Sequence, residues 1–243
     1  MTLPLALVTG SARRLGKAVA LTLARMGYSI ALHHRGSVDE ADKTAGEIRS
    51  LGVDCLPIRA DLTDPAQIST LFTELDFILH NSSLILSVVV NSAAVMQVGN
   101  PRDMDIRDWD AALDLNLRAP FLIAQHAAKR MTGGGVIVNI SDIGAQKAWS
   151  RYPSYTVSKA GLESLTKMLA RSLAPAIRVN AIAPGLVLPS DVVTPEQWKN
   201  LVEKLPLKRP AALEEITSAL EFLIKNEYIT GQTIVVDGGY SLI

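Results

Sequence analysis

The chain has 243 residues, of which 48% are hydrophobic, so it can bury a substantial core as one α/β domain. Its 24 basic residues are balanced by 24 acidic residues, and no basic field suggests a nucleic-acid partner. The single cysteine, Cys55, excludes an internal disulfide and fits a reducing compartment. The apolar run at 84–90 is too short to span a bilayer, and an early first strand leaves no space for a signal peptide. We therefore expect a cytoplasmic protein that does not bind membranes and that acts on a small molecule.

Short apolar runs alternate with helical patterns along the whole chain. The runs are almost continuously apolar, which is typical of parallel strands covered on both faces. The order predicts a single-domain Rossmann-type fold over 1–243, a doubly wound parallel sheet of about seven strands with helices on both faces. The expected strands are Leu5–Val8, Ser29–His33, Cys55–Ile58, Ser87–Val90, Val136–Ile140, Arg178–Ile182 and Thr233–Val236, and the clearest helices are Ala18–Met26 and Tyr155–Leu173. A proline-rich segment at about 186–210, with a short helix at Glu196–Lys204, is expected to form a lid.

The turn after the first expected strand reads VTGSARRLG, residues 8–16. In such a sheet the ligand binds beyond the carboxyl ends of the strands, with a pyrophosphate at a helix N-terminus. Gly10 and Gly16 would allow a tight turn and a close backbone approach, while Arg14 takes the place of a middle glycine. The turn predicts a dinucleotide site; the alternative is a plain connection between a strand and a helix.

The second expected strand runs into LHHRGS, residues 32–37, where a protein selecting NAD generally has a carboxylate. Arg35 and Ser37 would instead suit a ribose 2′-phosphate, because charge-assisted bonds to phosphate are strong. Arg13 or Arg14 could approach the same phosphate from the first turn. The predicted cofactor is therefore NADP (NADPH), and the alternative is that these arginines are solvated charges on a turn.

Tyr155 and Lys159 are four residues apart at the start of an expected helix and so share one face. An ammonium beside a phenol is expected to lower the phenol pKa from its reference of about 10. A tyrosine tuned in this way suits a general acid that works near neutral pH. The alternative is an ordinary surface pair.

Together these motifs resemble the short-chain dehydrogenase/reductase family over almost the whole chain. The other motifs that carry the resemblance are Asp61-Leu62, Asn91-Ser92-Ala93-Ala94, Asn116 in LNLRAPF, Pro184-Gly185, Ile229-Thr230-Gly231 and Val236-Asp237-Gly238-Gly239. The resemblance implies that Tyr155 delivers a proton, that Lys159 binds the nicotinamide ribose and tunes the tyrosine, and that Asn116 holds a water in a proton relay. With the two arginine segments it gives the expected cofactor-binding set, which is Gly10, Ser11, Arg13, Arg14, Leu15, His34, Arg35, Ser37, Asp61, Leu62, Asn91, Ser92, Ala93, Tyr155, Lys159, Pro184, Gly185 and Leu186.

One position departs from the family. A serine normally lies thirteen residues before the tyrosine and bonds the substrate carbonyl, and Asp142 occupies that place here. An ionised carboxylate only accepts hydrogen bonds, and its charge would push the tyrosine pKa upward. Asp142 suits proton delivery, or acceptance of N–H bonds from a nitrogen heterocycle. It resembles the pteridine reductase branch, whose catalytic set is Asp-Tyr-Lys; the alternative is that Ser141 takes the serine's role.

The expected substrate-binding set is Arg14, Val95, Asp142, Tyr155, Leu188 and Trp198, with no metal. Pteridine reductases commonly have an aromatic residue just after the fourth-strand motif, which stacks on the pterin. The corresponding place, near Val95 and Met96, has none. Trp149, Tyr152 or Trp198 could compensate from another direction.

Three functions stay open. The leading one is NADPH-dependent reduction of a pterin or related heterocyclic C=N bond. The second is reduction of a ketone or a 3-oxoacyl thioester by the same fold, and the third is a non-catalytic dinucleotide sensor, which would tolerate loss of Tyr155 or Lys159.

The helix expected at Tyr155–Leu173 also suggests self-association. It carries small or apolar residues at Val157, Ala160, Gly161, Leu165, Met168 and Leu169. Gly161 and Ala160 could let a second helix approach, and the family usually forms tetramers through this helix. We expect a homotetramer or homodimer; the alternative is that the whole stripe packs into its own sheet.

Overall fold

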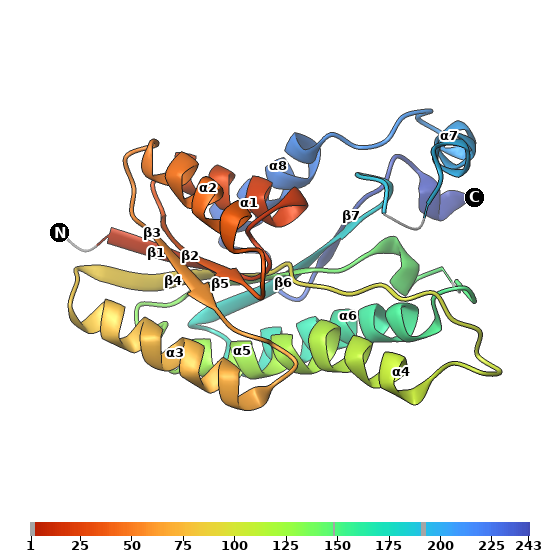
Figure 1. Cartoon of the computed structure of the whole chain (residues 1–243). Helices are drawn as coiled ribbons and strands as arrows, with labels where there is room; N and C mark the ends of the chain where they lie inside the picture. Colours follow the sequence, from red (N-terminus) through yellow and green to blue (C-terminus); the bar gives the residue numbers. More distant parts are fainter. Residues whose placement is uncertain (1–2, 148, 191–192) are drawn as a thin grey trace.

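A parallel sheet lies at the centre of the computed structural model, which describes residues 3–147, 149–190 and 193–243. Within these residues the sheet has seven strands in the order β3-β2-β1-β4-β5-β6-β7 (Figure 1). The strands are β1 Leu3–Val8, β2 Ser29–His34, β3 Cys55–Arg59, β4 Leu84–Asn91, β5 Gly135–Ile140, β6 Ile177–Pro184 and β7 Thr233–Val236. All neighbouring strands are parallel, which confirms the predicted doubly wound sheet.

Helices cover both faces of the sheet, as Figure 1 shows, with α1, α2 and α8 on one face and α3, α4, α5 and α6 on the other. Their bounds are α1 Arg14–Arg25, α2 Val38–Arg49, α3 Pro65–His80, α4 Ile106–Leu113, α5 Ala119–Ala128, α6 Pro153–Leu173, α7 Pro195–Lys204 and α8 Leu213–Lys225. Three short helical turns complete the chain, η1 Asp114–Arg118, η2 Ile143–Ala145 and η3 Tyr240–Leu242. The three helices expected from the sequence are all present, although α1 begins four residues earlier than its pattern.

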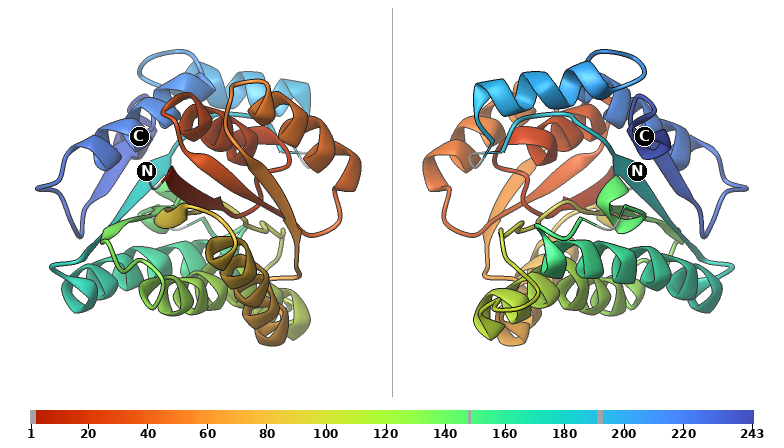
Figure 2. Two further views of the ribbon diagram at one scale, coloured as in Figure 1. Left: turned by 90° about the vertical axis from the view of Figure 1, so that its left-hand side faces the viewer. Right: turned by 90° about the vertical axis from the view of Figure 1, so that its right-hand side faces the viewer.

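Figure 2 shows helices on both sides of the sheet, and an apolar layer on each face holds them to it. On the α1 side, Val19 and Leu23 pack with the buried β2 residue Ile30. On the other side, Phe72 and Ile123 are fully or almost fully buried in the second layer. Apolar residues on both sides of each central strand explain why the strand patterns are continuous rather than alternating.

The strand order reverses between β1 and β4. Strands β2 and β3 lie on one side of β1, whereas β4 and all later strands lie on the other. A crevice forms at such a reversal, beyond the carboxyl ends of the strands. The two chain segments that leave β1 and β4 meet there, because a Cβ added to Gly10 would lie 2.9 Å from Ala93 Cα.

The expected lid segment, about 186–210, contains α7 (Figure 1). Residues 191–192 of this segment lie outside the described residues. Thr194 caps α7, and its hydroxyl and the Gln197 side chain form a reciprocal capping box. None of the residues of α7 is buried, so the helix contributes little to the core.

The described residues contain neither a membrane-spanning helix nor a cluster of metal ligands. None of their helices is both long enough and apolar enough to cross a membrane. Over the same ranges, no group of three or more His, Cys, Asp or Glu side chains is placed to hold a metal ion.

Candidate active site

A cleft of about 700 Å³ opens at the carboxyl ends of β1, β2, β4, β5 and β6. Most of the residues expected from the sequence come together in it. They are Gly10, Arg13, Arg14, Leu15, Arg35, Ser37, Asp61, Leu62, Ser92, Ala93, Val95, Asp142, Tyr155, Lys159, Pro184, Gly185 and Leu188. The cleft therefore combines a glycine turn, a cationic end and a tyrosine–lysine pair.

The glycine turn is built for close approach. Gly10 has a φ of +64°, and a Cβ added to Gly16 would lie 2.2 Å from the Gly10 carbonyl oxygen. Ser11 does not line the cleft. Its buried hydroxyl donates to the Val8 carbonyl oxygen at 2.7 Å and so ties the turn to the end of β1. The packing leaves the backbone at the start of α1 open to a ligand, as a phosphate site requires.

Arg14 keeps the backbone conformation of the glycine that it replaces. Its φ is +54°, in the left-handed region that costs a side chain roughly 1–2 kcal/mol. Its guanidinium donates to the Pro189 carbonyl oxygen at 2.8 Å and so joins the phosphate turn to the lid segment. Strain of this kind is typical of functional sites, where surrounding contacts hold it in place.

The end of β2 corrects one prediction. His34 was expected to bind the cofactor, but it does not line the cleft, whereas His33 does. His33 and His34 are adjacent in β2, so their side chains point to opposite faces of the sheet, and Arg35 and Ser37, which follow the strand, line the cleft with His33. The opposite directions of neighbouring side chains in a strand would have predicted His33, rather than His34, at the cleft.

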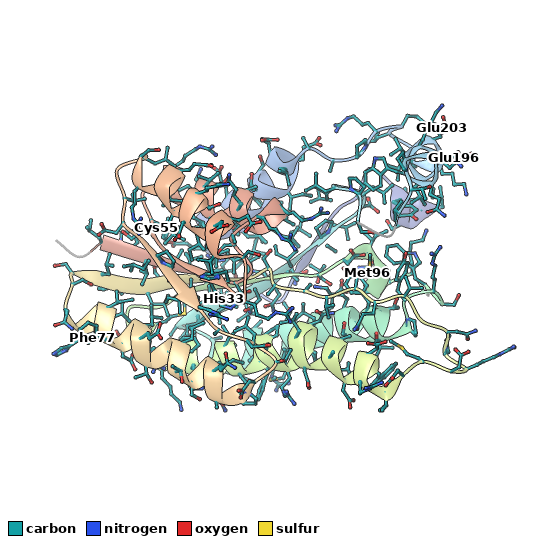
Figure 3. The ribbon with its side chains drawn as sticks, in the orientation of Figure 1. His33, Cys55, Phe77, Met96, Glu196 and Glu203 are labelled. Carbon is teal, nitrogen blue, oxygen red and sulfur yellow. The ribbon has the colours of Figure 1, made fainter. Side chains whose placement is uncertain are left out.

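His33 links the glycine turn to the segment after β3, and Figure 3 labels this residue near the middle of the molecule. Its Nδ1 accepts from the Gly10 N–H and its Nε2 donates to the Ala60 carbonyl oxygen, each at 3.0 Å. These partners select the neutral tautomer with the proton on Nε2. Burial lowers the pKa of His33 to about 4, so the ring is neutral at physiological pH.

At the other end of the cleft, Tyr155 Oη donates to Asp142 Oδ2 at 2.9 Å. Asp142 follows β5, and its Oδ1 accepts from the Gly144 N–H at 2.7 Å. Lys159, one turn further along α6 than Tyr155, donates to the Ile140 carbonyl oxygen at 2.7 Å. The predicted Asp-Tyr-Lys set is thus assembled from the end of β5 and the start of α6.

Two opposing effects on the Tyr155 pKa were expected, a lowering by Lys159 and a raising by Asp142. The lysine was expected to lower the pKa of Tyr155, but burial and the Asp142 carboxylate raise it well above its usual range. Asp142 is in direct contact, whereas Lys159 Nζ lies 5.7 Å from the centroid of the ring. Burial also lowers the pKa of Lys159 to about 8 and raises the pKa of Asp142. Tyr155 is therefore held as a protonated donor.

Ser141, the alternative to Asp142, has a different partner. Its buried hydroxyl donates to Glu163 Oε1 at 3.2 Å. The side chain that contacts Tyr155 is Asp142.

Asn116 does not line the cleft but supports it. It lies in the π-helical turn η1, a type of irregularity common at functional sites. Its side chain bonds the Val95 N–H and carbonyl oxygen, each at 2.9 Å, and donates to Ser158 Oγ at 3.0 Å. Asn91 is also set back, and donates to Asn139 Oδ1 at 2.8 Å. Asn116 thus holds the backbone of Val95, which lines the cleft.

A second cavity of about 640 Å³ adjoins the first and reaches α7. Leu186 and Trp198, expected at the cofactor and the substrate respectively, both line this cavity. Met96 also lines it, and Figure 3 shows this residue at the end of the molecule that carries α7. Because Asp142 lines both cavities, a ligand in the second cavity would also meet this carboxylate.

Comparisons with known proteins agree with this geometry. A family model described as enoyl-(acyl carrier protein) reductase matches residues 10–241. The 3-oxoacyl-[acyl-carrier-protein] reductase of Staphylococcus aureus is 34% identical over 96% of each chain. The NADP complex of an alternative dihydrofolate reductase from Brucella suis is 36% identical, with a TM-score of 0.92 over 98% of this chain and 95% of that one.

A third similar protein, an angucycline C-6 ketoreductase with bound NADP, is 31% identical, with a TM-score of 0.93 over 99% of this chain and 96% of that one. The NADP in these two solved structures agrees with the predicted cofactor. The match over almost the whole chain also confirms the predicted class of enzyme. The chain belongs to the short-chain dehydrogenase/reductase family, a family of NAD(P)-dependent oxidoreductases.

Proposed function

We propose that the chain reduces a C=N bond of a pterin or a related nitrogen heterocycle, with NADPH as the hydride source. The observation that carries this proposal is the Asp142 carboxylate, 2.9 Å from Tyr155 Oη, where the family has a serine. A serine hydroxyl can donate to a carbonyl oxygen, whereas an ionised carboxylate can only accept. Asp142 therefore suits a ring that presents N–H groups.

In the proposed reaction, carbon receives a hydride and nitrogen receives a proton. The nicotinamide, when bound, supplies the hydride, and most of the difficult chemistry belongs to that cofactor. Tyr155 donates the proton from Oη, and the Asp142 carboxylate, which accepts from that hydroxyl and has its pKa raised by burial, can take up a proton and return it to Tyr155. Lys159, held by the Ile140 carbonyl oxygen, would orient the nicotinamide ribose.

The cofactor site fits NADP in its chemistry. Arg13, Arg35 and Ser37 line the same end of the cleft and could bind a 2′-phosphate through charged and hydroxyl donors. Gly10 and the start of α1 would hold the pyrophosphate. The NADP complexes of the Brucella and angucycline proteins support the same assignment.

Carbonyl reduction is the second candidate, and by the names of the relatives it has more support than pterin reduction. The Staphylococcus relative is a 3-oxoacyl reductase and the angucycline protein is a ketoreductase, although the Brucella protein is an alternative dihydrofolate reductase. Burial raises the pKa of Asp142, and a protonated carboxyl could donate to a carbonyl oxygen. Asp142 would then replace the family serine in the same role.

A substrate panel tests the two candidates. NADPH oxidation is followed at 340 nm with dihydrobiopterin, dihydrofolate and a 3-oxoacyl thioester under identical conditions. The proposal predicts turnover of at least one of the two dihydro compounds, with a kcat/KM above that for the thioester. Turnover of the thioester alone would replace the first candidate with the second.

We also propose a homo-oligomer that forms through α6, although not through the whole of the expected stripe. Leu165 and Leu169 pack into the core of their own chain. Gly161 is also occupied, because a Cβ there would lie 2.9 Å from Leu117 Cδ2. Val157 and Met168 remain exposed, at 47% and 45%. Together with exposed Ala160 they form a face that could pair with a second copy, and sedimentation that shows only monomer at micromolar concentration would refute this.

We propose a cytoplasmic location. The buried thiol of Cys55, the only cysteine in the sequence, has its pKa raised to about 11 by burial, so it stays protonated and unreactive. A lone thiol of this kind is in keeping with a reducing compartment. Cell fractionation tests the location.

A further inference from the structure

One wall of the second cavity is formed by a tryptophan beside the catalytic carboxylate. Trp149 lines the cavity and follows the turn η2, which holds Gly144. A Cβ added to Gly144 would lie 2.8 Å from Trp149 Cε3, so the indole packs directly on this glycine. The same glycine donates its N–H to Asp142 Oδ1 at 2.7 Å. Trp149 is therefore tied to the turn that positions Asp142.

Two further rings hold the indole in place. Tyr152 meets Trp149 edge-on at a centroid distance of 6.3 Å, and Tyr240, from η3, lies at 6.1 Å. Lys147 fixes Tyr240 in turn, because its Nζ lies 4.8 Å from the centre of that ring and donates to the Tyr240 carbonyl oxygen at 2.9 Å. Lys147 Nζ also donates to the Ile243 carbonyl oxygen, which further holds the segment that carries Tyr240. Rings held in this way present a rigid face to a ligand.

We propose that Trp149 is the stacking face for the planar ring of the substrate, and that Tyr240 supports it from the C-terminal turn. This inference rests on the proposed function, because it concerns the heterocycle that Asp142 would bind. Trp149 would supply, from the second cavity, the aromatic surface that the sequence lacks near Val95. Substrates with a planar heteroaromatic ring would then be preferred over aliphatic carbonyl compounds.

Trp198 is the other tryptophan in the cavity, and the structure favours Trp149 over it. Trp198 lies on α7, which has no buried residue. Among the described residues, no aromatic pair includes Trp198, whereas Trp149 takes part in two. Trp149 also packs against the turn that carries Asp142. A preorganised face loses less freedom on binding.

The test uses Trp149→Leu, which removes the flat ring, and Trp149→Phe, which keeps one. The probe is fully oxidised biopterin, which is titrated into the NADP⁺ complex while the heat of binding is recorded by calorimetry, a readout that does not depend on the tryptophan removed. We expect Trp149→Leu to weaken biopterin binding about tenfold or more, and Trp149→Phe to weaken it less. Trp109→Phe is the matched control, because Trp109 lies on α4 and does not line either cavity. NADPH affinity, measured separately, should be unchanged in all three variants and shows that each is folded.

The outcomes separate this inference from the proposed function. If the wild type binds biopterin in a Trp149-dependent way but turns over no dihydropterin, the stacking face stands and the proposed reaction fails. If Trp149→Leu binds biopterin as tightly as the wild type, or if the wild type does not bind it, the stacking face is refuted. In the first of these two cases, turnover of dihydropterin by the wild type would leave the proposed function intact.

Discussion

The hydroxyl of Tyr155 and the carboxylate of Asp142 form a direct hydrogen bond of 2.9 Å inside the buried end of the cleft. The donor and acceptor come from α6 and from the segment after β5, so the fold, rather than proximity in sequence, brings them together. Burial and the carboxylate both raise the pKa of Tyr155, so the hydroxyl is protonated at physiological pH.

Replacing Tyr155 with Phe removes the proton and leaves the ring. We expect kcat to fall by about 10²–10⁴-fold, the usual contribution of general acid–base catalysis, while the NADPH dissociation constant changes little. Steady-state kinetics and a fluorescence titration with NADPH measure the two effects. Wild-type kcat in this variant would remove Tyr155 from the mechanism.

The pKa of Lys159 sets an expected upper pH limit. Burial lowers it to about 8, and Asp142 opposes that shift. The ammonium is therefore lost as the pH rises through about 8, and we expect kcat/KM for NADPH to fall over that range. In Asp142→Asn the opposing charge is gone, so the fall should move to lower pH. A pH profile with the same or a higher midpoint in this variant would contradict the account.

Two arginines are expected to act on different parts of NADPH. Losing a charge-assisted phosphate contact costs roughly 1.5–3 kcal/mol, or about ten- to a hundredfold in affinity. Arg35→Ala should raise KM for NADPH by this factor and leave KM for NADH nearly unchanged. Arg14→Ala should weaken both cofactors, because Arg14 lies in the pyrophosphate turn. Equal use of NADH and NADPH by the wild type would show that the arginines serve another purpose.

His33 is expected to make stability depend on pH. Its pKa is about 4 in the folded protein against an ordinary 6.5, because burial disfavours the charged ring. The unfolded chain therefore binds more protons between these values, and stability falls as the pH is lowered from 6.5 towards 4. The difference between the two pKa values corresponds to about 3 kcal/mol of unfolding free energy. His33→Asn can still accept from the Gly10 N–H but has no imidazole to protonate. Urea unfolding at pH 7 and pH 4.5 should therefore show a smaller loss of stability in this variant than in the wild type. An equal loss in the two proteins would contradict the prediction.

Much of this site could be predicted from the sequence, because local patterns carry it. The spacing of Tyr155 and Lys159 fixes them on one helix face, and continuous apolar runs predict the buried parallel strands. Both features survive folding unchanged, since they depend on the geometry of single elements.

Other features depend on contacts that no local pattern records. The upward effect of Asp142 on the Tyr155 pKa was expected from its place thirteen residues before the tyrosine, but burial, the largest cause of the shift, depends on tertiary packing. Gly161 looked available to a second helix, but Leu117 fills the space beside it. Trp149 and Tyr240 are about ninety residues apart in the chain, and the local sequence around either residue does not indicate that the two rings meet.

The central claim is that Asp142 directs this active site towards a nitrogen heterocycle. The most direct measurement is the ratio of kcat/KM for dihydrobiopterin to kcat/KM for a 3-oxoacyl thioester, taken with NADPH for the wild type and for Asp142→Ser. The account predicts a ratio above one for the wild type and a fall of about tenfold or more in the variant, because the serine hydroxyl donates to a carbonyl and the N–H acceptor is lost. A wild-type ratio below one that Asp142→Ser leaves unchanged would contradict it.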